Sequence, residues 1–236
     1  MDDLDRSVDL LDPEPWRLGE TLIERSRNLC GAGDGFPEPA GSLGIGAVLV
    51  NECGEFVAQG RNRVLETGSP APLAGSLLGH AEMTAFVELG VRTAQGMTFY
   101  TTVGPCLMCT STAISMRLPT ICSAAGDPVF EGLDEVLSSH SYMDQRMPTR
   151  EQLDDSELAA FAALLPLSHR VWAKPGSPPR REWIASLRAL WEAAVAALPT
   201  LTNLRHEGAD VEAVIRGIRP LLEQPTETMI CRRPSS

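Results

Sequence analysis

Lysine is almost absent from this chain of 236 residues, in which Lys174 is the one lysine. The formal net charge is −11. Residues 1–143 hold nineteen Asp and Glu against eight Arg, whereas residues 144–236 hold twelve acidic and twelve basic residues. A protein that binds a polyanion needs basic groups to replace phosphate counterions. This charge pattern therefore makes a nucleic-acid partner unlikely and favours a small neutral ligand.

Long apolar runs are also missing. No stretch approaches the roughly 20 apolar residues that a membrane-spanning helix needs. The N-terminus, Met1-Asp2-Asp3-Leu4-Asp5, is acidic and lacks the basic-then-apolar order of a signal peptide. We therefore expect no membrane association and a cytoplasmic protein.

Among the six cysteines only one Cys-x-x-Cys pair occurs, at Cys106 and Cys109. A structural zinc cage would need a second such pair, and a redox pair would need a thioredoxin-like context. The other four cysteines are scattered, which favours free thiols over a disulfide framework. They are Cys30, Cys53, Cys122 and Cys231.

Two short segments together contain the groups of a catalytic zinc site. Cys106 and Cys109 are three residues apart, so on a helix they lie on one face and can bind one ion together. His80 supplies a third ligand, and a catalytic zinc site keeps its fourth position open for water. Glu82, two residues after His80, can carry protons beside such a site. A lone histidine at a helix start is more often a cap, but the combination favours catalysis.

The pattern His80-Ala81-Glu82 followed by Pro105-Cys106-Leu107-Met108-Cys109 resembles the cytidine-deaminase-like superfamily. The likeness runs from about residue 43 to residue 128. It is strongest to the branch of bacterial tRNA adenosine deaminases, guanine deaminases and fungal-type cytosine deaminases. The resemblance implies a three-layer α/β/α fold, Zn²⁺ as cofactor with ligands His80, Cys106 and Cys109, and Glu82 as catalytic proton carrier.

The same resemblance implies four substrate-binding positions. Asn62 matches an asparagine that hydrogen-bonds the substrate ring in relatives, although a turn asparagine is an equal alternative. The backbone N–H of Ala81 would contact a substrate carbonyl. Asp127 lies where relatives contact a sugar or base edge, or forms an ordinary Asp-Pro turn. Gly104 is a departure, because similar purine deaminases usually have glutamate before Pro-Cys.

Apolar periodicity predicts alternating strands and helices up to residue 143, which is typical of a layered sheet. We expect a zinc-dependent deaminase core at residues 1–143 and a helical C-terminal extension at 144–236 docked on it. A fifth strand is only weakly indicated, at 169–173. The predicted helices cover 16–29, 79–89, 105–117, 130–140, 157–167, 182–198 and 210–222. The predicted strands cover 45–51, 55–61, 97–103 and 120–125.

These features lead to a functional prediction: a zinc-dependent aminohydrolase that acts on a nucleobase, a nucleoside or a related amino-heterocycle. A tRNA adenosine-to-inosine deaminase is the first alternative, opposed by the acidic residues 1–143. A non-catalytic, zinc-stabilised regulatory protein is the second, opposed by Glu82, because a structural site needs no proton carrier. The resemblance also implies a homo-oligomer, most simply a homodimer.

Overall fold

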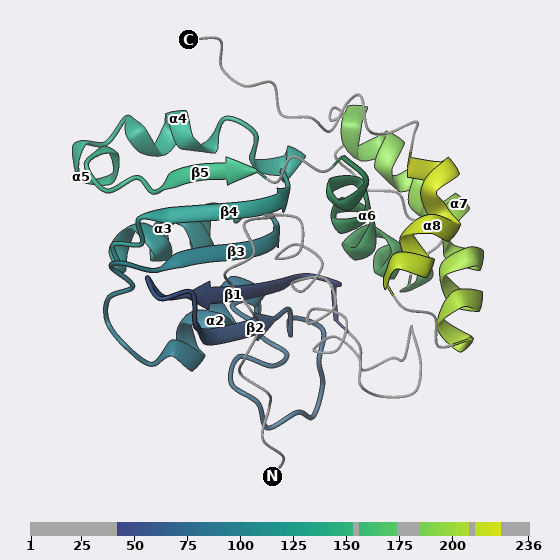
Figure 1. Cartoon of the computed structure of the whole chain (residues 1–236), viewed down its shortest axis with the longest axis horizontal. Coiled ribbons are helices and arrows are strands. Elements are labelled where there is room, and N and C mark those ends of the chain that lie inside the picture. The colour runs from purple at the N-terminus through teal and green to yellow at the C-terminus, as the bar shows by residue number, and fades with distance from the viewer. Residues whose placement is uncertain (1–41, 153–155, 174–184, 208–210, 223–236) are drawn as a thin grey trace.

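The computed structural model describes residues 42–152, 156–173, 185–207 and 211–222, which form one mixed sheet with helices around it (Figure 1). Neighbouring strands follow the order β2-β1-β3-β4-β5. β1 is antiparallel to both β2 and β3, whereas β3, β4 and β5 run parallel. The strands are β1 (Gly46–Val50), β2 (Phe56–Arg61), β3 (Thr98–Val103), β4 (Thr120–Ala125) and β5 (Thr149–Gln152).

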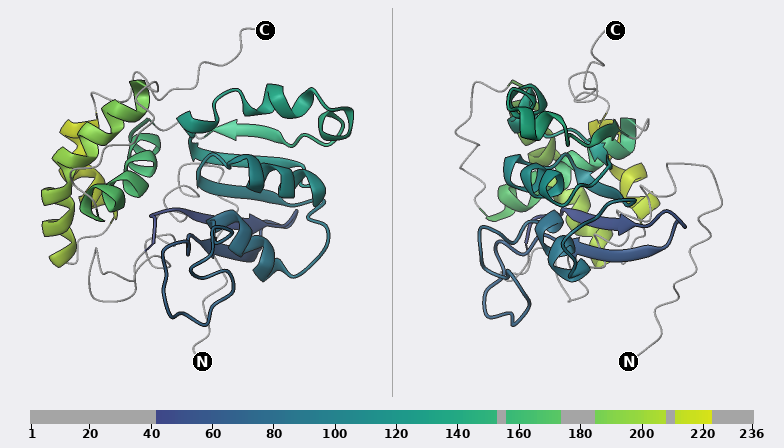
Figure 2. Two further views of the ribbon diagram at one scale, coloured as in Figure 1. Left: turned by 180° about the vertical axis from the view of Figure 1, so that it is seen from behind. Right: turned by 90° about the vertical axis from the view of Figure 1, so that its left-hand side faces the viewer.

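Helices lie on both faces of this sheet. α2 (Ala81–Leu89) and α3 (Leu107–Ser115) cover one face, where Leu49 and Phe99 are fully buried. α6 (Ser156–Ala173) covers β3 and β4 from the other face, where it packs against Cys122 and Ala124. Figure 2 shows the same layers from behind and from the side. The α/β three-layer fold predicted from the sequence is confirmed.

The residues of β1 explain its central position. All five are buried, as expected for a strand paired on both sides and covered on both faces. Successive side chains of a strand point to opposite faces. Ala47 and Leu49 accordingly pack with α2, whereas Val48 and Val50 belong to a separate small cluster on the other face.

The position of α2, which begins beside His80, depends on its close contact with β2. The helix ends at Gly90, which adopts a left-handed conformation with φ of 67° and closes the last turn as a C-cap. Gly60 of β2 faces its first turn so closely that a Cβ there would lie 2.1 Å from the carbonyl oxygen of Ala81 and 2.4 Å from the amide of Ala85. Any side chain at residue 60 would push the helix away from the strand.

We therefore predict that Gly60→Ala destabilises the fold by about 2–3 kcal/mol, because the overlap involves backbone atoms that cannot rotate away. The matched control is Gly126→Ala, since a Cβ at Gly126 would meet nothing within 4 Å. Urea unfolding should place the control within about 0.5 kcal/mol of wild type. Equal stability of the two variants would contradict this account of the contact.

The predicted fifth strand at 169–173 is wrong. Those residues belong to α6, which continues through Pro166 and buries Leu164, Leu167 and Val171 at helical spacing. The fifth strand is β5, which pairs in parallel with β4. Its sequence, Thr-Arg-Glu-Gln, is polar and mostly exposed, so no apolar pattern marks it. Between β4 and β5 lie a 3-10 turn η1 (Pro128–Phe130), α4 (Leu133–Ser138) and α5 (Ser141–Asp144).

The remaining helices are α7 (Ala185–His206) and α8 (Val211–Leu222), which pack with α6 around Leu164, Trp191 and Ile218. The helical character predicted for residues beyond 143 is present, although β5 from this region joins the sheet. The division into domains at 143 and 144 stays a prediction. The helix predicted at 16–29 lies outside the described residues. Within the described helices, none is long and apolar enough to cross a membrane.

Candidate metal centre

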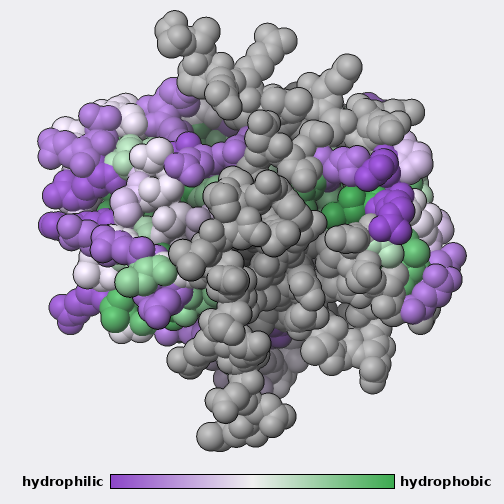
Figure 3. Space-filling view, viewed as in Figure 1, coloured by the Kyte–Doolittle hydropathy of each residue, from purple (hydrophilic) through white to green (hydrophobic). Residues whose placement is uncertain are grey.

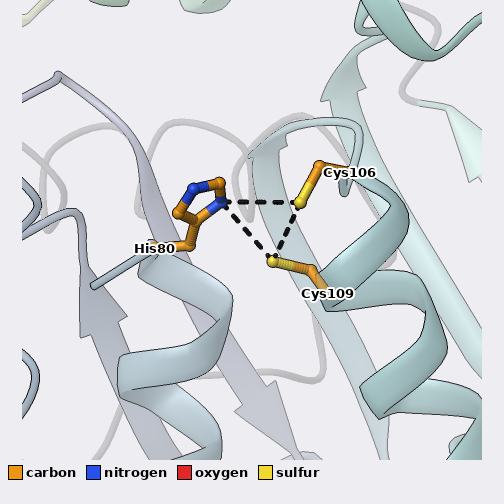
Figure 4. Close-up of side chains that lie close together, drawn as sticks. All are labelled: His80, Cys106 and Cys109. Atoms are coloured by element: carbon orange, nitrogen blue, oxygen red, sulfur yellow. Dashed lines mark hydrogen bonds between the residues drawn. The ribbon is translucent and has the colours of Figure 1, made fainter. Parts of the chain in front are cut away.

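His80, Cys106 and Cys109 meet between the N-terminal ends of α2 and α3 (Figure 4). The Nδ1 atom of His80 lies 3.5 Å from Sγ of Cys106 and 3.7 Å from Sγ of Cys109. The two sulfur atoms are 3.5 Å apart. His80 and Cys106 are 26 positions apart in the sequence, so the sheet and its two helices bring these ligands together.

This triangle has the dimensions of a tetrahedral zinc site. Zn–S bonds of about 2.3 Å and Zn–N bonds of about 2.0 Å give edges of about 3.8 Å between sulfurs and about 3.5 Å between sulfur and nitrogen. The observed separations of 3.5 and 3.7 Å lie within a few tenths of an ångström of those edges. One imidazole and two thiols in this arrangement fit zinc, and three protein ligands leave one position for water or substrate.

Both ligand-bearing segments open helices. His80 is the N-cap of α2 and Cys106 is the N-cap of α3, each with extended backbone angles. The positive end of a helix dipole favours the thiolate form of a nearby cysteine. The Cys106 and Cys109 thiols also share a hydrogen bond, which lowers the pKa of Cys106 to about 4 and raises the pKa of Cys109. The bond to Cys106 raises the pKa of His80.

Glu82 lies in the first turn of α2 with 4% of its surface exposed. Burial raises the pKa of its carboxyl to about 7, and the negative charge of Cys106 acts in the same direction. The carboxyl also interacts with the side chain of Cys109. A buried carboxyl with a pKa near 7, beside a metal ligand set, can both take up and release a proton at neutral pH.

Asn62 follows β2 and is almost fully buried. Its Oδ1 atom accepts hydrogen bonds from Ser42 Oγ at 2.6 Å and from the amide of Val64 at 3.1 Å. The next residue, Arg63, donates its amide to the carbonyl of Gly79, which places this turn beside the ligand helix. Asn62 thus has an observed structural role, and its contact with a substrate stays a prediction.

The other predicted substrate positions also lie around the centre. Ala81 is fully buried as the first residue of α2, where an amide has no intrahelical acceptor. Asp127 is close enough to raise the pKa of His80, and its Oδ1 accepts from the amide of Val129 at 2.8 Å. The Gly104 amide donates to Ala125, and a Cβ at Gly104 would lie 3.3 Å from the amide of Asp127. Their roles toward substrate stay predictions.

A charged cluster at the end of β2 was not predicted. Glu66 is 5% exposed and forms ion pairs with Arg61 and, at 2.9 Å, with Arg63. One carboxylate therefore neutralises two arginines, and these arginines flank Asn62 in the sequence. No sequence pattern predicts these ion pairs, because it is the conformation of the loop after β2 that places Glu66 next to Arg61.

The fold and the ligand set together define a zinc-binding protein of the deaminase class. Residues 32–125 match the family described as the cytidine and deoxycytidylate deaminase zinc-binding region. A tRNA-specific adenosine deaminase of Aquifex aeolicus is 30% identical over 122 residues, which cover 47% of this chain and 76% of that one. The chain belongs to the cytidine-deaminase-like superfamily, and zinc is the cofactor for which its ligand set is suited.

A further relative and a solved structure are also similar to this chain. A tRNA-specific adenosine deaminase of Streptococcus pyogenes is 26% identical over 157 residues, covering 65% of this chain and 81% of that one. Among solved structures, a guanine deaminase from Nitrosomonas europaea is 20% identical and has a TM-score of 0.44, covering 65% of this chain and 82% of that one.

Proposed function

We propose that this protein is a zinc-dependent hydrolytic deaminase that releases ammonia from a small nucleobase, nucleoside or related amino-heterocycle. The observation that supports this most directly is the buried Glu82 carboxyl beside His80, Cys106 and Cys109. A structural metal site requires no such group. Burial of a carboxyl costs free energy of folding, so its presence beside the ligands favours a catalytic role.

Each residue of the centre has a role in this proposal. His80, Cys106 and Cys109 would hold zinc, which acts as a Lewis acid that makes water nucleophilic near neutral pH. Glu82 accepts one proton of the attacking water and transfers it to a ring nitrogen. It then takes the proton of the newly added hydroxyl and passes it to the departing amine, so that the carbonyl forms as ammonia leaves. The amide of Ala81 and the Nδ2 group of Asn62 would orient the ring, with Asp127 and Gly104 at its edge.

The surroundings of the centre favour a small neutral substrate. Arg61 at the end of β2 and Arg63 just after it are both paired with Glu66. Leu78, two residues before His80, and Leu107, directly after Cys106, are apolar and about half exposed. A polyanion would need free cationic groups at such positions. A homodimeric assembly and a cytoplasmic location remain predictions that accompany this proposal.

A tRNA adenosine deaminase remains the second candidate, because the Aquifex aeolicus relative at 30% identity bears that name. Arginines that are paired in the free protein could exchange Glu66 for phosphate. The two candidates differ in a measurable way, since phosphate contacts make binding strongly dependent on salt. Binding of tRNA that falls steeply with salt, together with inosine formation, would favour this second candidate.

Ammonia release by the zinc-loaded protein tests the proposal. The compounds are guanine, isoguanine, cytosine, adenine, their nucleosides and amino-triazines, with Glu82→Ala as the control. We expect release from at least one compound and none from the variant. Inosine formation in tRNA, with no release from any small compound, would replace this function with the second candidate. Zinc binding with neither activity would leave a non-catalytic protein.

A further inference from the structure

A chain of hydrogen bonds connects the edge of the sheet to the cysteine ligands. Arg150 of β5 binds both carboxylate oxygens of Asp134 of α4, at 2.9 and 3.1 Å. A nitrogen of the same guanidinium donates to Thr110 Oγ1 at 3.0 Å. Thr110 Oγ1 in turn donates to the carbonyl oxygen of Pro105 at 3.2 Å, inside the core. Pro105 directly precedes the ligand Cys106.

The donors and acceptors in this series of hydrogen bonds follow from the chemistry of the side chains. A guanidinium can only donate, so the Thr110 hydroxyl must accept from Arg150 and has its own proton free for Pro105. Asp134, which only accepts when ionised, holds the guanidinium in place through a bidentate pair. Hydrogen bonds in such a series polarise one another. Arg150 therefore strengthens the bond from Thr110 to Pro105.

Thr110 holds the ligand segment at two points. Its hydroxyl binds the carbonyl of Pro105, and its amide donates to the carbonyl of Cys106 at 2.9 Å. Its own position follows directly after the ligand Cys109, and its side chain is fully buried. The carbonyls of Pro105 and Cys106 are thus both bound by the residue that follows Cys109, which holds the backbone of one ligand against the backbone of the other.

We propose that Thr110 and Arg150 are positioning residues for the zinc ligands Cys106 and Cys109. Arg150 acts through Thr110, and Asp134 acts through Arg150. Arg150 and Asp134 lie outside the residues that match the family's zinc-binding region, 32–125. Figure 1 shows β5 at the edge of the sheet next to β4 and near α4, so the edge strand supports the metal centre from outside the matched segment. This inference uses the assigned zinc ligands and does not depend on which substrate is deaminated.

The test measures zinc retention in the full-length, zinc-loaded protein, by transfer of zinc to a colorimetric chelator. Thr110→Val keeps the shape of the side chain and removes the hydroxyl, and Arg150→Gln removes the guanidinium. Loss of groups that orient a metal ligand typically costs about 10- to 100-fold in metal affinity. We expect a loss of about 10-fold or more in both variants, and near-normal affinity in Thr110→Ser, which restores the hydroxyl.

Two further measurements separate positioning from general stability. Arg219→Gln breaks the partly exposed ion pair to Glu157, 2.9 Å long, and should leave zinc affinity unchanged. In cobalt-loaded protein, the sulfur-to-metal absorption bands should shift in Thr110→Val and Arg150→Gln and not in Arg219→Gln. The double variant should lose little more affinity than Thr110→Val alone, because both changes interrupt one chain.

Several outcomes would overturn the inference. Wild-type zinc affinity in both variants would do so, as would fully additive losses in the double variant. An equal loss in Arg219→Gln would assign the effect to overall stability. A failed ammonia screen with these zinc effects present would reject the proposed function and leave the positioning role standing.

Discussion

Cys109→Ala is expected to lose zinc and to unfold at a lower temperature than wild type. Cys109 is 1% exposed and lies 3.5 and 3.7 Å from the other two ligand atoms. Changes that merely disturb a ligand's orientation cost about 10- to 100-fold in affinity, so removal of the ligand itself should cost more. Because zinc binds only the folded chain, its loss removes stability, about 2.7 kcal/mol if zinc is present at 100 times its Kd.

Cys122→Ala provides the matched control, since Cys122 is also a buried free thiol but faces α6 from β4. It should keep one zinc per chain, measured by atomic absorption after dialysis. A chelator should lower the melting temperature of wild type and Cys122→Ala, and leave that of Cys109→Ala unchanged. Stoichiometric zinc in dialysed Cys109→Ala would show that the metal centre lies elsewhere.

The ligand set could be predicted from the sequence because its chemistry is local. Cys106 and Cys109 are one helical turn apart, and His80 and Glu82 share one segment, so spacing alone limits what they can do. The structure adds the separations of 3.5 to 3.7 Å between ligand atoms, which the sequence could not provide. It also adds the burial of Glu82, which raises the pKa of that carboxyl to about 7.

The strands and helices around the centre were predictable for a similar reason. β1 is a continuous apolar run, and α2 ends at a glycine that can adopt positive φ. β5 was not predictable, because an edge strand of polar residues shows no burial period. The extent of α6 was also missed, since Pro166 suggests an end to a helix that in fact continues to Ala173.

The contacts that support the centre were the least predictable. Arg150 and Thr110 are 40 residues apart, and Glu66 reaches Arg61 only through a loop. Such pairings depend on the register of β4 with β5 and on loop conformation, and neither leaves a pattern in the sequence. Hydrophilic residues prevail at the left-hand edge of the space-filling view, where α4, α5 and β5 lie (Figure 3). A polar edge of this kind resembles ordinary surface until the partners of its side chains are known.

Glu82→Gln is expected to abolish turnover while zinc remains bound. Glutamine has nearly the same shape and fits the buried space of Glu82, but it cannot accept the proton of water or pass it to a ring nitrogen. General acid–base catalysis contributes about 10²- to 10⁴-fold to a rate. We expect kcat to fall within that range with the substrate found in the ammonia screen, and KM to change little, because the proton is transferred only during the reaction.

The matched control is Glu88→Gln, on the same helix but exposed to solvent. It should retain activity within about twofold, because Glu88 interacts with the backbone of Gln59 and with Arg63 and is not one of the residues of the metal centre. Zinc content and thermal unfolding, measured on both variants, establish that neither has lost the site or the fold. More than about one-tenth of wild-type kcat in Glu82→Gln would assign proton transfer to another group. A loss of zinc in Glu82→Gln would instead make Glu82 a metal ligand. Measuring kcat and zinc content together thus separates a catalytic role of Glu82 from a role as a ligand.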